Sequence, residues 1–147
     1  MSENVIVGGA GHDAPARCRR LRPQATATGK QGLDYQVGIS AQSVGARAIH
    51  LQLATLPPAL RGKAHKHPQH ETAIYALSGT SAVWFGERLE QHEVIAAGEF
   101  FYIPANVPHL PYNPHATEAA VVVIARTDPN EQENVQMLPE LDHLRRG

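Results

Sequence analysis

Short apolar runs alternate with glycine and proline turns along most of the chain, from about residue 33 onward. Several runs alternate apolar and polar positions with the period of two that a strand surface requires. No long amphipathic helical pattern interrupts them, although residues 138–144 suit one or two helical turns. The pattern predicts an all-β fold, an antiparallel sandwich or barrel. We expect strands at residues 33–39, 46–56, 72–77, 81–85, 99–103, 107–112 and 119–125.

The clearest alternation lies in the second of these runs. Ile49, Leu51 and Leu53 share one face of the expected strand, and His50 and Gln52 share the other. We interpret it as a half-buried strand whose polar face meets water. The alternative places the histidine and the glutamine in a polar pocket or an interface.

The chain divides into three parts by pattern. Residues 1–30 are irregular, and we interpret them as an arm that lies on a partner subunit. Residues 31–138 form the expected barrel domain, and residues 139–147 a tail. A domain of this length buries a full core without disulfides or a structural metal, so a metal here would be functional.

Composition excludes several partners. The chain has 13 basic and 14 acidic residues, and a net charge of -1 provides no attraction for nucleic acid or an anionic membrane. Its one cysteine, Cys18, cannot form an internal disulfide, and we find no secretory signal or long apolar run. We therefore expect a cytoplasmic protein. We also expect a homodimer, because small barrels have exposed sheet edges that are usually covered.

Candidate metal ligands gather in one short segment. His65, His67 and His70 fall within six residues, and Glu71 follows directly. Histidines two positions apart in an extended chain point to the same side. Imidazole is a favoured ligand for zinc, copper, iron and nickel, and a carboxylate adds an oxygen donor. Such a site is partly open and leaves positions for water or substrate.

A second segment, residues 98–113, carries one further histidine. Gly98 begins an expected strand, Pro104 ends it, and Asn106 suits a tight turn. His109 then opens the next strand. This arrangement aims the histidine from a strand edge toward a fixed point.

Together the two segments resemble the paired motifs of the cupin superfamily, over residues 62–113. The first is similar to H-x-H-x3,4-E followed by a glycine, and the second to G-x5-P-x-G-x2-H-x3-N. The chain is most similar to small, single-domain bacterial cupins of the sugar-epimerase type. The resemblance implies a jelly-roll barrel of two antiparallel sheets. It also implies one divalent transition metal (iron, manganese, nickel or zinc) held by His65, His67, Glu71 and His109.

Two departures from the family pattern concern turns. Asn106 stands where the family usually has glycine, and asparagine tolerates the left-handed conformation better than other side chains. The glycine expected before the first motif falls at Ala59, and we expect Gly62 to serve that turn instead.

The third departure concerns the carboxylate ligand. The spacing from Glu71 to Gly79 is one residue longer than the family's, so counting back from the glycine places Thr72 at the ligand position. Glu71 reaches the metal if a one-residue bulge between Glu71 and Gly79 turns its side chain to the inner face of the strand. Without a bulge, His70 shares the inward face with Thr72. We take Glu71 as the ligand because its spacing from His67 fits directly, and keep His70 as the alternative.

An open site of three imidazoles and one carboxylate favours a metal-dependent enzyme that acts on a small organic molecule. By analogy of fold, dioxygenase-like chemistry comes first, and Lewis-acid isomerisation or decarboxylation second. The alternative is a non-catalytic small-molecule binder or sensor. An enzyme needs an acid or base besides its ligands, and the candidates are His70 and Tyr75, with His50 and Glu87 after them.

Overall fold

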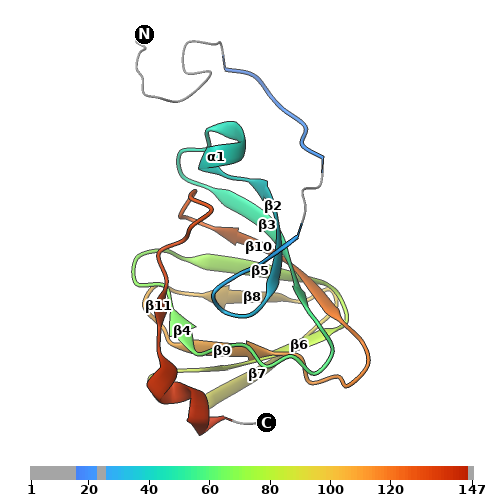
Figure 1. The fold of residues 1–147 in the computed structure, drawn as a ribbon, viewed down its shortest axis with the longest axis vertical. Coiled ribbons are helices and arrows are strands. Elements are labelled where there is room, and N and C mark those ends of the chain that lie inside the picture. Colours follow the sequence, from blue (N-terminus) through green and yellow to red (C-terminus); the bar gives the residue numbers. More distant parts are fainter. Residues whose placement is uncertain (1–15, 23–25, 146–147) are drawn as a thin grey trace.

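Two antiparallel sheets make up the molecule in a computed structural model, which describes residues 16–22 and 26–145 (Figure 1). The strands of one sheet, in order, are β1 (Ala27–Thr28), β2 (Asp34–Ile39), β3 (His50–Leu56), β10 (Ala120–Arg126), β5 (Thr72–Ser78) and β8 (Phe100–Ile103). Those of the other are β11 (Gln136–Met137), β4 (His65–Lys66), β9 (His109–Tyr112), β6 (Thr80–Phe85) and β7 (Gln91–Ala96). The chain crosses repeatedly between the sheets, which confirms the predicted all-β jelly roll.

All seven expected strands are present, some with shorter bounds. The sequence pattern did not reveal β7, because five of its six residues are exposed and only Ile95 is buried. The expected C-terminal turns form η1, a 3-10 helix over Pro139–Leu144. A short helix that the pattern did not predict, α1 (Ala41–Val44), is capped by the Ser40 side chain. Within the described residues, no helix is long and apolar enough to cross a membrane.

The space between the sheets has an apolar half and a polar half. Two neighbouring strands, β3 and β10, show the change along their inner faces. At one end Leu56 pairs with Ala120, and both are buried in the apolar core. At the other end His50 pairs with Arg126, and both are buried as well. The polar half is therefore built into the strands themselves and lies inside the barrel.

The alternation in β3 is oriented opposite to our main expectation. His50 and Gln52 face inward, and the His50 Nε2 and Gln52 Oε1 atoms lie 2.8 Å apart. Ile49 and Leu51 face outward and are 61% and 42% exposed. The alternative interpretation, a polar pocket, is therefore correct. A buried polar pair is tolerated because its two members hydrogen-bond to each other.

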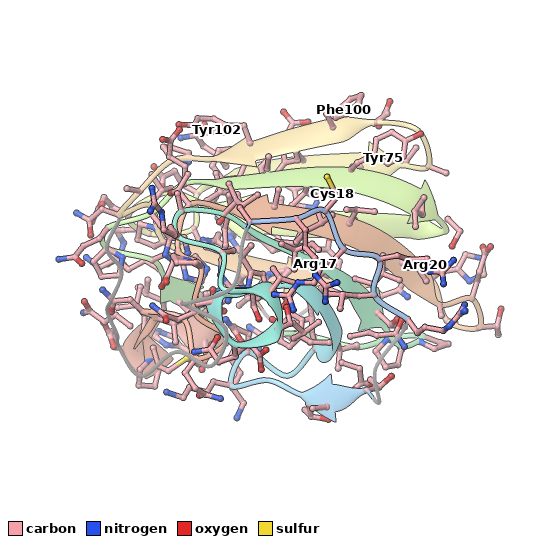
Figure 2. All side chains as sticks on the ribbon, turned by 90° about the horizontal axis from the view of Figure 1, so that it is seen from above. Arg17, Cys18, Arg20, Tyr75, Phe100 and Tyr102 are labelled. Carbon is pink, nitrogen blue, oxygen red and sulfur yellow. The ribbon has the colours of Figure 1, made fainter. Side chains whose placement is uncertain are left out.

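The outer face of the larger sheet is apolar. Leu53, Val123, Tyr75 and Phe100 are successive cross-strand neighbours on β3, β10, β5 and β8. The Phe100 side chain is 78% exposed. Figure 2 shows Tyr75 and Phe100 together at this border of the molecule. An apolar row across four strands is typical of a surface that another protein covers.

The predicted homodimer stays a prediction, and this face suits a second copy of the chain. Residues 16–22 run outside both sheets, and Cys18 within them is exposed (Figures 1 and 2). Of the rest of the expected arm, residues 1–15 and 23–25 lie outside the described residues, and residues 26–30 contain β1, which pairs with β2. The division into an arm, a barrel domain and a tail also stays a prediction.

Light scattering at micromolar concentration tests the homodimer. We expect twice the chain mass for the wild-type protein and a shift to monomer in Phe100→Asp, because a charge on the most exposed residue of the apolar row opposes burial. Val94→Asp is the matched control, since Val94 is also an exposed apolar residue but lies on β7 of the other sheet. A monomeric wild-type protein would contradict the prediction.

Candidate metal centre

Three histidines from the two sequence motifs meet inside the barrel. His65 begins β4 and is the cross-strand partner of His109, which begins β9. Their ring centroids are 4.2 Å apart, and the His67 ring is 5.0 Å from His65. One ring nitrogen of each histidine lies within 4.8 Å of the other two, and all three side chains are buried. This spacing allows one ion to contact all three.

Backbone carbonyls fix the tautomers of two of these histidines. His65 Nδ1 lies 2.7 Å from the Lys63 oxygen, and His109 Nδ1 lies 3.0 Å from the Val107 oxygen. Because a carbonyl only accepts, Nδ1 carries the proton in both rings. Nε2 then keeps its lone pair for a ligand bond. Metal-binding histidines are commonly oriented in this way.

Burial keeps the three imidazoles neutral. It is the largest cause that lowers the pKa of His67 to about 3 and that of His109 to about 4. Burial also lowers the pKa of His65 well below its ordinary value, and the neighbouring His109 and His67 lower it further. Neutral imidazole is the form that binds metal. The site is therefore prepared for a cation well below neutral pH.

The turns around the site tolerate the two departures from the family pattern. Asn106 adopts the left-handed conformation with φ 69°, as expected, and its backbone N–H donates to the His67 oxygen at 2.7 Å. That bond ties the second motif to the first. Ala59 also has a positive φ, 62°, so the first turn stays at the alanine. The expectation that Gly62 replaces it was wrong.

The structure does not place Glu71 among the histidines. Its side chain is exposed, and the Tyr102 hydroxyl donates to its carboxylate at 2.8 Å. A bulge does form in β5, since Val121 and Val122 pair with Ser78 and Ala76 and leave Leu77 extra. That bulge lies five residues beyond Thr72, which is buried, so it leaves Glu71 on the outer face.

Comparisons with known proteins identify the family of this chain. The cupin-domain family model matches residues 52–125, which is half of the chain. The chain belongs to the cupin family. No curated protein matches it by sequence.

Solved structures show the same fold at low identity. Oxalate decarboxylase from Lactobacillus farciminis, in a formate complex, has a TM-score of 0.62 and 18% identity, over 80% of this cupin and 33% of that chain. Bacillus subtilis oxalate decarboxylase, described for its Mn(II) centres, has a TM-score of 0.64 and 18% identity, over 78% and 30%. A Klebsiella pneumoniae protein with a double-stranded β-helix domain has a TM-score of 0.60 and 14% identity, over 76% and 88%. This cupin thus spans about a third of the oxalate decarboxylase chains.

The two leading acid–base candidates lie in different places in this cupin. Tyr75 faces outward, and its ring centroid is 4.8 Å from that of Phe100, so it is not part of the site. His70 is 3% exposed, and its ring centroid is 4.5 Å from that of His67. Both nitrogens of His70 are buried, and neither has a hydrogen-bond partner among the described residues. Such atoms favour a bound water or ion close by.

The sequence analysis missed two charged residues in the polar half of the barrel. Arg126 ends β10, and Glu133 lies on the loop between β10 and β11; the two side chains are 3% and 14% exposed. Glu133, His67 and His70 form a second group whose spacing suits a metal. Arg126 could have been found, because it continues the inward alternation of Val122 and Ile124. Glu133 lies in a polar loop without periodicity, so the sequence pattern does not indicate that it faces inward.

Two cavities meet at these residues. An inner cavity of about 80 Å³ is lined by the three histidines and by apolar side chains of both sheets. An outer cavity of about 560 Å³ lies beside it and includes Leu21 and Lys30. Five residues line both cavities and therefore separate them: Gln31, Tyr35, Gln52, Arg126 and Glu133.

Proposed function

We propose that this cupin is a metal-dependent enzyme that acts on a small organic molecule inside its barrel. His65, His67 and His109 would hold one divalent transition ion. The observation that supports this most strongly is the convergence of three buried neutral imidazoles, two of them with Nε2 free for a ligand. Three protein ligands leave positions open for a substrate.

The ion would supply dioxygenase-like chemistry if it is iron, or Lewis-acid chemistry for isomerisation or decarboxylation if it is manganese, nickel or zinc. The Mn(II) centres of oxalate decarboxylase make manganese one of the metals to test. The residues of this chain provide the surroundings. Ile74, Phe101 and Val122 line the inner cavity and restrict water.

A group that can move a proton supports an enzyme over a passive binder. His70 lies beyond the three proposed ligands, and its Nε2 is 3.6 Å from Glu133 Oε1. Its Nδ1 is 3.8 Å from Asp128. Burial lowers the pKa of His70, and Arg126 and His50 lower it as well, while these two carboxylates oppose the shift in part. We propose His70 as the residue that carries protons. A cytoplasmic location is also part of the proposal, based on the single cysteine, which cannot form an internal disulfide.

Turnover by stripped and reloaded protein tests this function. Tag-free protein is stripped of metal, reloaded with iron, manganese, nickel or zinc, and incubated with small organic acids and sugars with and without oxygen. We expect turnover, followed by NMR, with at least one metal, and a loss of turnover in His70→Gln without loss of metal. Saturable binding without turnover in every case would indicate the binder or sensor instead.

A further inference from the structure

The carboxylate of Glu133 lies at the boundary between the two cavities. Its Oε1 atom is 3.5 Å from Arg126 Nη1, 3.4 Å from His67 Nδ1 and 3.6 Å from His70 Nε2. Its Oε2 atom accepts a hydrogen bond from Gln31 Nε2 at 2.5 Å. One carboxylate is thus surrounded by an arginine, two imidazoles and an amide. Groups of this kind are those that recognise a carboxylate ligand.

The arginine is held in place independently of Glu133. Arg126 Nε donates to the Asp128 oxygen at 3.2 Å, and Nη2 donates to the Asn130 oxygen at 2.6 Å. These bonds orient the guanidinium, while Nη1 faces the carboxylate at a looser 3.5 Å. The arginine is therefore preorganised to receive an anion on that side.

We propose that the ligand of this cupin is a small carboxylic acid, and that its carboxylate takes the place of Glu133 beside Arg126. The ligand enters from the outer cavity, and the Glu133 side chain, which lines both cavities, turns aside. The Tyr35 hydroxyl and the Gln31 amide stand at the same boundary and are hydrogen-bonded at 3.1 Å, ready to contact the acid. The rest of the molecule then reaches the three histidines.

Charge makes this exchange selective. Arg126 is buried, and a buried cation without a partner is costly. A neutral ligand that displaced Glu133 would leave the guanidinium unpaired, whereas a carboxylate restores the pair. The pairing of Arg126 with a carboxylate does not require a metal.

The charge of a bound ion would also favour an anionic ligand, which rests on the proposed function. Glu71 lies outside the barrel, so three neutral imidazoles would hold a divalent ion without offsetting its charge. Among the histidines proposed as ligands, His67 has the carboxylate of Glu133 beside it, with Oε1 3.4 Å from its Nδ1. An anionic ligand supplies the missing negative charge.

The test uses malonate, with malonamide as its uncharged counterpart of similar shape, and isothermal titration calorimetry on metal-free and metal-loaded protein. We expect Glu133→Gln to bind malonate about tenfold more tightly than wild type, because the internal competitor is gone. In the same background, Arg126→Gln should weaken malonate binding at least about tenfold. Malonamide should not bind. Arg88→Gln is the matched control, since Arg88 is an exposed arginine outside both cavities, and should change nothing.

Several outcomes would overturn the inference. Unchanged affinity in Glu133→Gln would show that the carboxylate is only a structural partner. Malonate binding that survives Arg126→Gln but is lost in Lys30→Gln would place the anion in the outer cavity. If Arg126→Gln fails to fold, Arg126→Lys should still weaken binding, because it removes the planar fork. Arginine-dependent binding to metal-free protein that never takes up a metal would reject the proposed function alone.

Discussion

Alanine in place of His109 is expected to remove most of the metal from the purified protein, whereas glutamine in place of Glu71 should leave it. His109 provides one of three convergent imidazoles, and its Nε2 is free for a ligand bond. Loss of a residue that only hydrogen-bonds to a metal ligand already costs ~10–100-fold in metal affinity. Loss of a direct ligand should therefore cost about 100-fold or more. Elemental analysis after dialysis against a fixed concentration of free metal measures the effect.

The Glu71 variant decides between the family pattern, in which Glu71 binds the metal, and the structure, in which it lies on the outer face. The carboxylate of Glu71 accepts a hydrogen bond from Tyr102 on the outer surface, so Glu71→Gln should bind close to one ion per chain. His115→Ala controls for the loss of an exposed histidine, since the His115 side chain is 49% exposed. A full metal complement in His109→Ala would exclude the site. Loss of metal in Glu71→Gln would restore that residue as a ligand.

Metal-free protein is expected to lose stability steeply as the pH falls below 6.5. Burial lowers the pKa of His67 to about 3 and that of His109 to about 4, while the unfolded chain keeps the ordinary 6.5. Below pH 6.5 the unfolded chain therefore binds protons that the folded chain does not, and the free energy of unfolding falls with pH. At pH 5 each of these groups should cost about 2 kcal/mol, out of roughly 5–15 kcal/mol for a domain.

Urea unfolding between pH 7.5 and pH 4.5 measures this slope. His65, His50 and His70 have pKa values lowered in the same direction and add to the loss. Metal-loaded protein is the control: the ion binds the folded state, so its unfolding midpoint should lie at higher urea at every pH where binding persists. Stability that does not change from pH 7 to pH 5 in metal-free protein would show that these histidines are not buried in neutral form.

The sequence alone predicted the fold because its signals are local. Period-two runs and glycine or proline turns are sufficient to indicate strands, and Gly79 shows why the turns are restrictive. It has φ 70°, and a Cβ there would lie 2.3 Å from the Ala119 oxygen. The histidines were predicted for the same reason, since His65 and His67 lie two positions apart in one short segment and Asn106 forms the turn before His109.

The orientation of Glu71 and the position of the charged pair depend on long-range packing. The spacing left Glu71 and His70 as alternatives, and it gave no indication of the charged pair. Whether Glu71 or Thr72 faces inward is decided by pairing with β8 and β10, and the bulge at Leu77 cannot be placed by counting residues. Glu133 is near His67 only because its loop folds back over the barrel, 66 residues further along the chain. Apolar periodicity carries no information about such a contact.

Crystals of metal-loaded protein, measured at the absorption edge of the bound metal, test the central claim most directly. We predict one strong anomalous peak per chain, within ~2.1 Å of a ring nitrogen of His65, His67 and His109. Glu71 should remain beside Tyr102 in the same crystals. A peak elsewhere, no peak between the three rings, or a Glu71 carboxylate turned inward onto the ion would contradict the account.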